Sequence, residues 1–434
     1  MPVAPTSPTL IYQGDLKRAT TIPGVTSLTS SVPAMIAPDE FLGRIHASGT
    51  RFVVAATGGG SQAISALLAV PGGSRSVLAA TIPYSSTALV QWLGAYPEHY
   101  CTERTARSMA MTAYQQAINL AANEGGAGPI AGIACTASLV SDRPKRGAHR
   151  IHVAAQTAEL TAVASLELSK GARDRHGEEL IAARLLLNMI AQACGLSDRL
   201  TLPLKSPECV VENGTLAPAD WQTLVAGEIN ALLVDERCGD SATGETSFSV
   251  DAASRKARAI FPGAFHPLHA GHLAMAQIAE QRLGAAVAWE ISITNVDKPP
   301  LDFHEMRLRA TQFARADTST PGLALWFTRA PTFVAKASIF PGATFLVGAD
   351  TIERIAQPRY YRNDAAQRDE AVSSIAEAGC RFLVFGRRAQ DRFETLVDLN
   401  LPPELRALCE EVSEAEFRAD ISSTELRRAA GDGD

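Results

Sequence analysis

Apolar and polar positions alternate along the first half of the chain in a way that predicts strands followed by helices. Residues 51–56 form a short apolar run that ends in the string Thr57-Gly-Gly-Gly-Ser61. Residues 62–70 then follow helical spacing and stop at a Pro-Gly-Gly turn. Residues 178–194 are apolar on most helical faces and precede Gly195, so they predict a buried helix.

The second half shows a more regular alternation of the same two patterns. Short apolar runs predict strands at 257–261, 287–293, 324–328, 344–347 and 381–385. Helical spacing predicts helices at 271–283 and 304–314. Strands that alternate with helices indicate a parallel α/β sheet.

Between the two halves, the string 238–247 is small, polar and without periodicity, which is typical of a linker. We therefore expect an α/β protein of two domains. The predicted divisions are a loosely ordered lead-in at 1–40, a first domain at 41–237 whose core is 41–195, a linker at 238–255, and a second domain at 256–434.

Composition argues against several kinds of partner and site. The 434 residues carry a net charge of −6, which argues against a broad basic surface for duplex nucleic acid. The seven cysteines are widely spaced with no C-x-x-C pair, so neither a disulfide framework nor a zinc site of that type is expected. No signal pattern and no apolar run of about 18 residues is present, which favours a cytoplasmic protein without a membrane partner.

The string 261–273 has the most chemical content. A predicted strand runs into a glycine turn, and His269 and His272 follow at the start of a predicted helix. Free N–H groups and partial positive charge at a helix start suit phosphate, and Gly263 and Gly271 allow close approach of a ligand. Two imidazoles there suit a triphosphate. The alternative is a turn with two surface histidines.

A second string, Ile421-Ser-Ser-Thr-Glu-Leu-Arg427, predicts another helix start. The hydroxyls of Ser422, Ser423 and Thr424 can cap this helix, which is the simpler interpretation. The same hydroxyls together with Arg427 also suit the β- and γ-phosphates of a nucleotide.

The two strings, Gly263-Ala-Phe-His-Pro-Leu-His-Ala-Gly-His272 and 421–427, together resemble the H-x-G-H nucleotidyltransferases, specifically nicotinamide or nicotinate mononucleotide adenylyltransferases. The resemblance covers about 256–430 and implies a Rossmann-like domain. Such a domain would use Mg²⁺ and transfer AMP from ATP to a pyridine mononucleotide. It implies that His269 and His272 are catalytic. It also implies that ATP is bound by Gly263, Phe265, Gly271, Arg387, Ser422, Ser423, Thr424 and Arg427.

Two further positions follow from the same resemblance. Lys298 would meet a phosphate of the substrate, and Asp350, in a G-x-D segment, would face a ribose or nucleotide. Arg307 corresponds to a family arginine, although Arg307 and Arg309 are equally well interpreted as a solvated helix face.

The sequence departs from the family at two points. His266 stands where an Asn or Asp is usual, and 358–361 replaces a tryptophan region that helps hold the acceptor base. Tyr360, Tyr361 or Trp326 would have to supply the stacking instead. The first motif is shared with pantetheine-phosphate adenylyltransferases and cytidylyltransferases. The alternatives are therefore a phosphopantetheine-like or CTP-linked substrate, or a nucleotide-binding regulator without catalysis.

The first half resembles the C-terminal domain of competence-damage-inducible (CinA) proteins, the nicotinamide-nucleotide amidase family. The resemblance is carried, in order and spacing, by 54–59, 70–73, 83–89, 101–110 and 131–136. The family's nucleophilic serine aligns with Ala55 and its activating lysine with Leu89. A serine nucleophile needs a base, so we expect no amidase activity.

Part of that degenerate amidase site remains, namely Thr57, Gly58, Gly59 and Tyr84. Two interpretations stay open for the first domain. It binds a mononucleotide phosphate through the remaining loop, or it is purely structural or mediates homo-oligomers.

Overall fold

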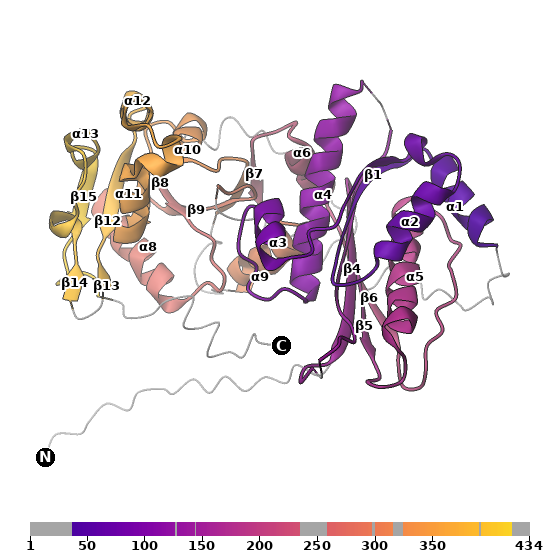
Figure 1. Ribbon diagram of the computed structural model, residues 1–434. Coiled ribbons are helices and arrows are strands. Elements are labelled where there is room, and N and C mark those ends of the chain that lie inside the picture. The colour runs from indigo at the N-terminus through magenta and orange to yellow at the C-terminus, as the bar shows by residue number, and fades with distance from the viewer. Residues whose placement is uncertain are drawn as a thin grey trace, which may run out of the picture. The chain divides into compact units, whose positions relative to one another are not determined.

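The computed structural model describes residues 37–125, 128–143, 145–234, 258–296, 300–315, 324–389 and 392–418. From Ile36 onward the chain forms one compact unit, in which the elements of two sheets follow one another (Figure 1). The predicted linker at 238–255 lies outside the described residues, and only 37–40 of the predicted lead-in are described. No helix in the described ranges is long and apolar enough to cross a membrane.

The first sheet has the strand order β2-β1-β3-β4-β5-β6. Strands β2, β1 and β3 are parallel, and β4, β5 and β6 continue the sheet in antiparallel pairs. The strands are β1 (Arg51–Thr57), β2 (Val77–Thr81), β3 (Ile130–Ser138), β4 (His149–Thr157), β5 (Leu160–Leu168) and β6 (Val210–Leu216). β4 and β5 are joined by a short turn, whereas α5 lies in the chain between β5 and β6.

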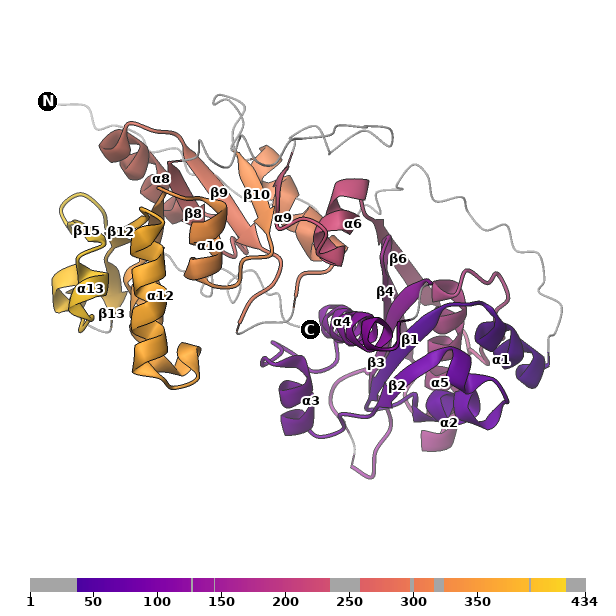
Figure 2. The same cartoon turned by 90° about the horizontal axis from the view of Figure 1, so that it is seen from above.

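Helices cover both faces of this sheet (Figure 2). One face carries α3 (Ser86–Leu93) and α4 (Glu103–Asn123), and the other carries α1 (Pro38–Ala47), α2 (Ser61–Ala69) and α5 (Arg175–Ala193). The predicted helix at 178–194 is confirmed as α5, and Gly195 follows it at φ 73°, a backbone conformation that favours glycine.

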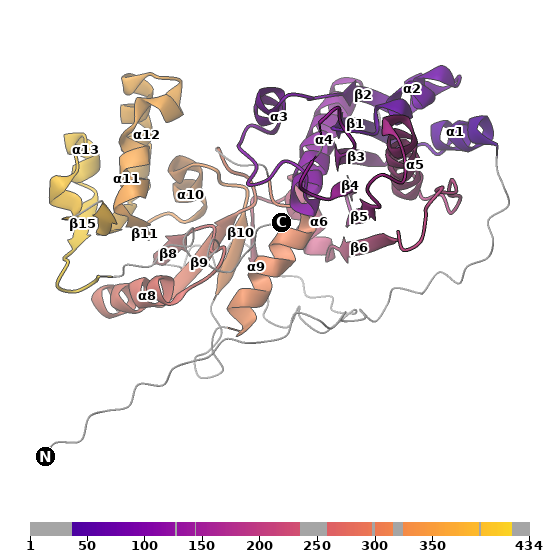
Figure 3. The same ribbon diagram turned by 60° about the horizontal axis from the view of Figure 1, so that its bottom comes forward.

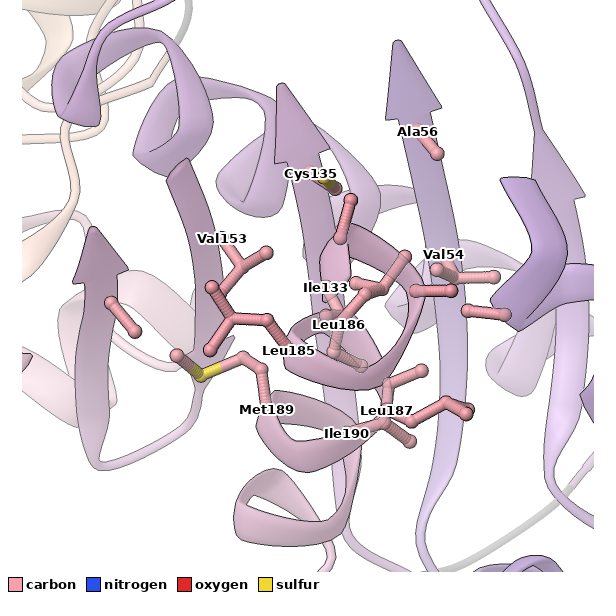
Figure 4. Close-up of a cluster of buried hydrophobic side chains, with 14 of the residues drawn as sticks. Val54, Ala56, Ile133, Cys135, Val153, Leu185, Leu186, Leu187, Met189 and Ile190 are labelled. Carbon is pink, nitrogen blue, oxygen red and sulfur yellow. The ribbon is translucent and has the colours of Figure 1, made fainter. Parts of the chain in front are cut away.

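The α5 side of the sheet holds the largest apolar cluster of the first half. Because side chains alternate along a strand, Val54, Ile133 and Val153 all point to the same face. There they meet Leu186 and Ile190 of α5 (Figure 4). This packing explains why α5 is apolar on so much of its surface.

The second sheet has the order β15-β12-β11-β8-β9-β10-β7. Its strands are parallel except β7, which is antiparallel to β10. The strands are β7 (Ala231–Val234), β8 (Ala259–Pro262), β9 (Val287–Ser292), β10 (Leu325–Thr328), β11 (Thr344–Gly348), β12 (Arg381–Phe385) and β15 (Cys409–Val412). Successive strands run outward from β8 in one direction and from β11 in the other, which is the doubly wound order.

Helices also cover both faces of the second sheet (Figure 3). One side carries α8 (Ala270–Leu283) and α9 (Phe303–Arg315), and the other carries α10 (Phe333–Ile339), α11 (Ala349–Ala356) and α12 (Ala365–Glu377). Smaller elements are η1 (Gly73–Arg75), η3 (Pro358–Tyr361), β13 (Arg387–Ala389), β14 (Arg392–Glu394), η4 (Leu396–Asp398) and α13 (Pro403–Arg406). The predicted α/β class is confirmed, and the structure builds it from two sheets.

The two sheets are joined by a shared core. The segment before the predicted linker supplies α6 (Ala219–Ala226) and β7, and β7 completes the edge of the second sheet. Trp221 of α6 packs edge-on against Phe327 of β10, with ring centroids 5.4 Å apart. Met111 and Tyr114 of α4 belong to the same buried cluster. The first half therefore contributes a strand, a helix and core side chains to the second.

Candidate functional site

The strand order of the second sheet reverses between β8 and β11, and the predicted site residues lie around that point. In doubly wound sheets, ligands bind beyond the carboxyl ends of the strands where the order reverses. The loop 263–269 follows β8, Asp350 follows β11, and Arg387 follows β12. The topology thus brings together positions that are more than a hundred residues apart.

The loop after β8 is shaped by one backbone hydrogen bond and by the backbone conformation of Phe265. Gly263 donates its N–H to the carbonyl of Glu290, 2.9 Å away in β9. Phe265 has φ 42°, in the left-handed region, and turns its ring back over Gly263. A Cβ on Gly263 would lie 2.5 Å from that ring, so any larger residue would have to displace the ring. The absence of a side chain on Gly263 therefore leaves room for the Phe265 ring.

His269 and His272 stand together at the first turn of α8. His269 occupies the N-cap position with extended backbone, and the two imidazole rings are stacked with centroids 3.7 Å apart. The backbone N–H of His269 donates to Nδ1 of His272 at 3.3 Å. Because Nδ1 accepts, the proton of a neutral His272 is assigned to Nε2.

Burial keeps both rings uncharged. It lowers the pKa of His269, and burial together with the neighbouring His269 lowers the pKa of His272 to about 3. The His272 ring packs edge-on against Phe261 and Phe265, which excludes water from one side. Nδ1 of His269 is buried and has no partner among the described residues. At neutral pH the pair offers ring N–H groups rather than positive charges.

The start of α8 is open. Within the described ranges, no carboxylate accepts a hydrogen bond from the backbone N–H of Ala270 or Gly271. These groups belong to the first turn, whose N–H groups have no partner inside the helix. With the partial positive charge of the helix end, they are the kind of groups that suit an anion beside the two imidazoles.

Asp350 and Arg387 lie at the neighbouring strand ends. Asp350 is in the first turn of α11, partly exposed, with its carboxylate 4.0 Å from Arg354. Arg387 pairs with Glu353 of α11 at 3.1 Å and with Glu394 of β14 at 3.5 Å. Both side chains remain accessible to a ligand at this edge. Lys298, Ser422, Ser423, Thr424 and Arg427 lie outside the described residues.

The structure changes the interpretation of two other residues. Arg309 is buried and lies 3.1 Å from Glu305, so a solvated helix face is wrong for it. Arg307, by contrast, is exposed and donates to the carbonyl of Leu216 at 2.6 Å. Trp326 is buried in β10 against Phe340, with ring centroids 5.5 Å apart, so it cannot stack on a ligand.

Tyr360 and Tyr361 lie in the short helix η3 after α11. Tyr361 is half-buried, and Tyr360 lies under the guanidinium of Arg359 at 4.8 Å. Of the three aromatic residues considered for stacking, these two remain.

An ion pair that sequence reasoning missed supports the β8 loop. Lys336 of α10 binds the carboxylate of Glu290 at 2.7 Å, and Thr328 donates its hydroxyl to the same group. All three side chains are buried. Because the carbonyl of Glu290 holds Gly263, this cluster fixes the strand ends beneath the loop. The signal was a single carboxylate inside the apolar run 287–293.

In the degenerate amidase site of the first half, the positions that align with the family's serine and lysine are apolar. Ala55 and Leu89 are both buried in one apolar cluster with Leu93 and Ala106. Thr57 donates its hydroxyl to the carbonyl of Pro83 at 2.9 Å, so it is engaged in the fold. Tyr84 is exposed.

The glycine loop before α2 is already filled by the protein itself. The carboxylate of Glu179, from α5, accepts from the backbone N–H of Gly60 at 3.0 Å and of Gln62 at 3.1 Å. It also accepts from the hydroxyl of Ser61 at 3.0 Å. Gly58 and Gly59 pack closely against β3, where a Cβ on Gly58 would lie 1.9 Å from the Ala137 carbonyl oxygen. A buried carboxylate thus occupies the place that a phosphate would take.

Comparison with known proteins finds one family model that is similar to the second half. Residues 260–429 match the family model described as Cytidylyltransferase-like. Among curated proteins, none matches the chain. Several solved structures resemble the N-terminal part.

One is the competence/damage inducible protein CihA from Agrobacterium tumefaciens, at 19% identity over 38% of this chain and 99% of that one, with a TM-score of 0.29. Another is a CinA superfamily protein from Escherichia coli, at 19% identity over 36% and 90%, with a TM-score of 0.28. A third is the competence damage-inducible protein A from Klebsiella pneumoniae, at 16% identity over 38% and 100%, with a TM-score of 0.27. Residues 260–429 are a cytidylyltransferase-like domain of the H-x-G-H superfamily.

Proposed function

We propose that this protein is a nucleotidyltransferase that transfers AMP from ATP to nicotinamide or nicotinate mononucleotide, giving a dinucleotide and pyrophosphate. The observation that carries the proposal is the stacked pair His269 and His272 on the open start of α8, at the strand-order reversal. Phosphoryl-type transfer needs positioning and charge stabilisation rather than a protein nucleophile, and this arrangement supplies both.

In the proposed reaction, an oxygen of the acceptor's 5′-phosphate attacks the α-phosphorus of ATP in line. One P–O bond forms to the acceptor, and the bond between the α-phosphorus and the bridging oxygen breaks, so pyrophosphate leaves with that electron pair. Nε2–H of His272 and the first-turn N–H groups of α8 donate to the oxygens on which charge develops. Arg387 is within reach of the same strand edge and would neutralise the outer phosphates.

Mg²⁺ would neutralise the polyphosphate when bound with ATP. Among the described residues, no group of three or more His, Cys, Asp or Glu side chains is arranged to hold a metal ion. This fits an ion held mostly by phosphate oxygens and water, with one protein carboxylate at most. Asp350 is the accessible carboxylate at the strand edge that suits that role.

The acceptor is identified by turnover. The protein is incubated with Mg²⁺, with ATP or CTP, and with nicotinamide mononucleotide, nicotinate mononucleotide or 4′-phosphopantetheine, and pyrophosphate is measured. We expect release with ATP and a pyridine mononucleotide. Release only with CTP or only with phosphopantetheine would replace the acceptor assignment. Tight nucleotide binding with no release under any condition would instead indicate a regulator.

For the first half, we propose a structural role without amidase activity. Two features support this: the apolar burial of Ala55 and Leu89, and the carboxylate of Glu179 in the glycine loop. The full chain should release no ammonia from nicotinamide mononucleotide above the rate without protein. Ammonia release that scales with protein concentration would overturn this assignment.

A further inference from the structure

Helix α9 belongs to the second half in sequence, but its first turns lie on the first half. The backbone N–H of Phe303 donates to the hydroxyl of Thr161 in β5 at 3.1 Å. One turn later, Arg307 donates to the carbonyl of Leu216 in β6. Phe303 is fully buried in the core that both halves share. The N-terminal end of α9 is therefore fixed against the first sheet.

Arg107 of α4 reinforces this attachment with two buried ion pairs. Its Nε lies 3.1 Å from Asp302, and its Nη2 lies 3.2 Å from Glu305. All three side chains are less than a tenth exposed. The other oxygen of Asp302 accepts from the backbone N–H of Glu305 at 2.8 Å and so caps α9. A single arginine of the first half thus binds both the cap and the first turn of this helix.

The other end of α9 holds the loop that carries the histidines. The side-chain oxygen of Gln312 accepts from the backbone N–H of Leu268 at 2.8 Å, and Leu268 directly precedes His269. Phe313 packs edge-on against Phe265, at 5.5 Å between ring centroids, and against Trp289 at 5.3 Å. The ten residues from Phe303 to Gln312 form about 15 Å of continuous helix between the two attachments.

We infer that Arg107 is a positioning residue for the nucleotide site. It fixes α9, and α9 in turn fixes the 263–273 loop in which His269 and His272 stand. Among the described residues, the ion pairs of Arg107 are to Asp302 and Glu305 at the start of α9, so its effect on the loop would pass through α9. This inference rests on the proposed function for the identity of the ligand. It gives the first half a role that needs neither the serine nor the lysine of an amidase.

The test compares Arg107→Ala with Arg173→Ala in the full chain. Arg173 also forms a well-buried ion pair, to Glu208 at 2.7 Å, but that pair lies within the first half and away from α9. Backbone hydrogen exchange is followed by mass spectrometry, and ATP binding with Mg²⁺ is measured by calorimetry. Arg107→Ala should speed exchange in 263–273 and weaken ATP binding by about 5- to 150-fold, the range of ordinary coupling between sites. Arg173→Ala should change neither.

Turnover provides a second readout that a purely structural role would not give. In Arg107→Ala the KM for ATP should rise more than kcat falls, and Arg107→Lys should recover part of the loss because it restores the charge. By reciprocity, ATP added to the unaltered protein should slow exchange in 103–111. Unchanged loop exchange and unchanged ATP affinity in a folded Arg107→Ala protein would overturn the inference.

If Arg107→Ala does not fold, Gln312→Ala replaces it, because it breaks the loop contact and leaves the ion pairs between the halves intact. Exchange should then rise in 263–273 and stay constant in 103–111; constant exchange in both segments would refute the inference. These exchange measurements need no acceptor. A failure of turnover with every acceptor would therefore reject the proposed function without deciding the role of Arg107.

Discussion

The glycine loop before α2 and the loop 263–269 before α8 each join a strand to a helix, and they differ in what lies at the helix start. Before α2, the carboxylate of Glu179 takes the N–H groups of Gly60 and Gln62. Before α8, two neutral imidazoles stand beside first-turn N–H groups that no described carboxylate occupies. We call the loop before α2 the closed loop, because a carboxylate of the protein accepts its N–H groups. We call the loop before α8 the open loop, because no described carboxylate does so.

This difference shows that a glycine loop does not by itself predict a phosphate site. A helix start attracts any anion, and a carboxylate attached to the same chain has a large advantage over a dissolved one. What distinguishes the two loops is the neighbouring helix: α5 delivers Glu179 to the first loop, whereas α9 delivers Gln312, which contacts the loop backbone and leaves the helix start free.

The largest effect is expected at the open loop. His272→Ala removes the Nε2–H donor and should lower the rate of pyrophosphate release by about 100- to 1,000-fold, as the loss of one transition-state donor usually does. His176→Ala changes an exposed histidine of α5 in the first half, so it serves as the control and should retain full activity. Turnover by a folded His272→Ala protein close to that of the control would contradict the role of the histidine pair.

The next effect is expected at the closed loop. Glu179→Ala leaves the N–H groups of Gly60 and Gln62 without an acceptor and should lower the free energy of unfolding by about 2–4 kcal/mol. Phosphate should then restore part of the stability, because the vacated place suits an anion. Glu159→Ala, at an exposed position, should do neither. Thermal unfolding with and without phosphate measures both effects, and an unchanged melting temperature for Glu179→Ala would disprove them.

Acid should lower the free energy of unfolding through His272 in a defined pH range. Burial and the proximity of His269 lower the pKa of His272 from 6.5 to about 3, so the unfolded chain binds a proton more readily than the folded one between these values. The contribution of neutral His272 to the free energy of unfolding is complete above pH 6.5. It is lost as the pH falls toward 3, at no more than about 1.4 kcal/mol per pH unit. His272→Gln should make this decline shallower in denaturant titrations, whereas an equally steep decline would refute the assignment.

The smallest effect concerns protons taken up with the nucleotide. The polyphosphate of ATP favours the charged form of the imidazoles, so binding should raise the lowered pKa values of His269 and His272 and take up a fraction of a proton near pH 6. Calorimetry in two buffers of different ionisation enthalpy measures this uptake. Identical binding enthalpies in the two buffers would show that the histidines stay neutral in the complex.

Much of the second half could be predicted from sequence, because parallel strands are continuous apolar runs with clear ends. The predicted strands at 287–293 and 381–385 and the helix at 271–283 agree with β9, β12 and α8 to within one residue at each end. The placement of the H-x-G-H loop at a helix start also followed from its glycines and histidines. These features depend on neighbours in sequence, which is why pattern was sufficient.

Contacts between distant segments could not be predicted in the same way. Glu179 reads as one more acidic residue at the start of a helix, and only the fold brings it to Gly60. Arg107 likewise lies among small residues of α4, and its partners Asp302 and Glu305 come almost two hundred residues later. Ion pairs of this kind are set by tertiary packing, and no periodicity in one segment encodes them.

The antiparallel pairing of β7 with β10 has a practical consequence for dividing the chain. A fragment that begins at the predicted domain start, residue 256, would lack β7 and leave one side of β10 with unpaired N–H and C=O groups. Bare strand edges of this kind recruit strands from other molecules, so the fragment should aggregate. The Trp221 packing on Phe327 would be lost with it and would expose a large apolar patch. A soluble second half should therefore begin before α6.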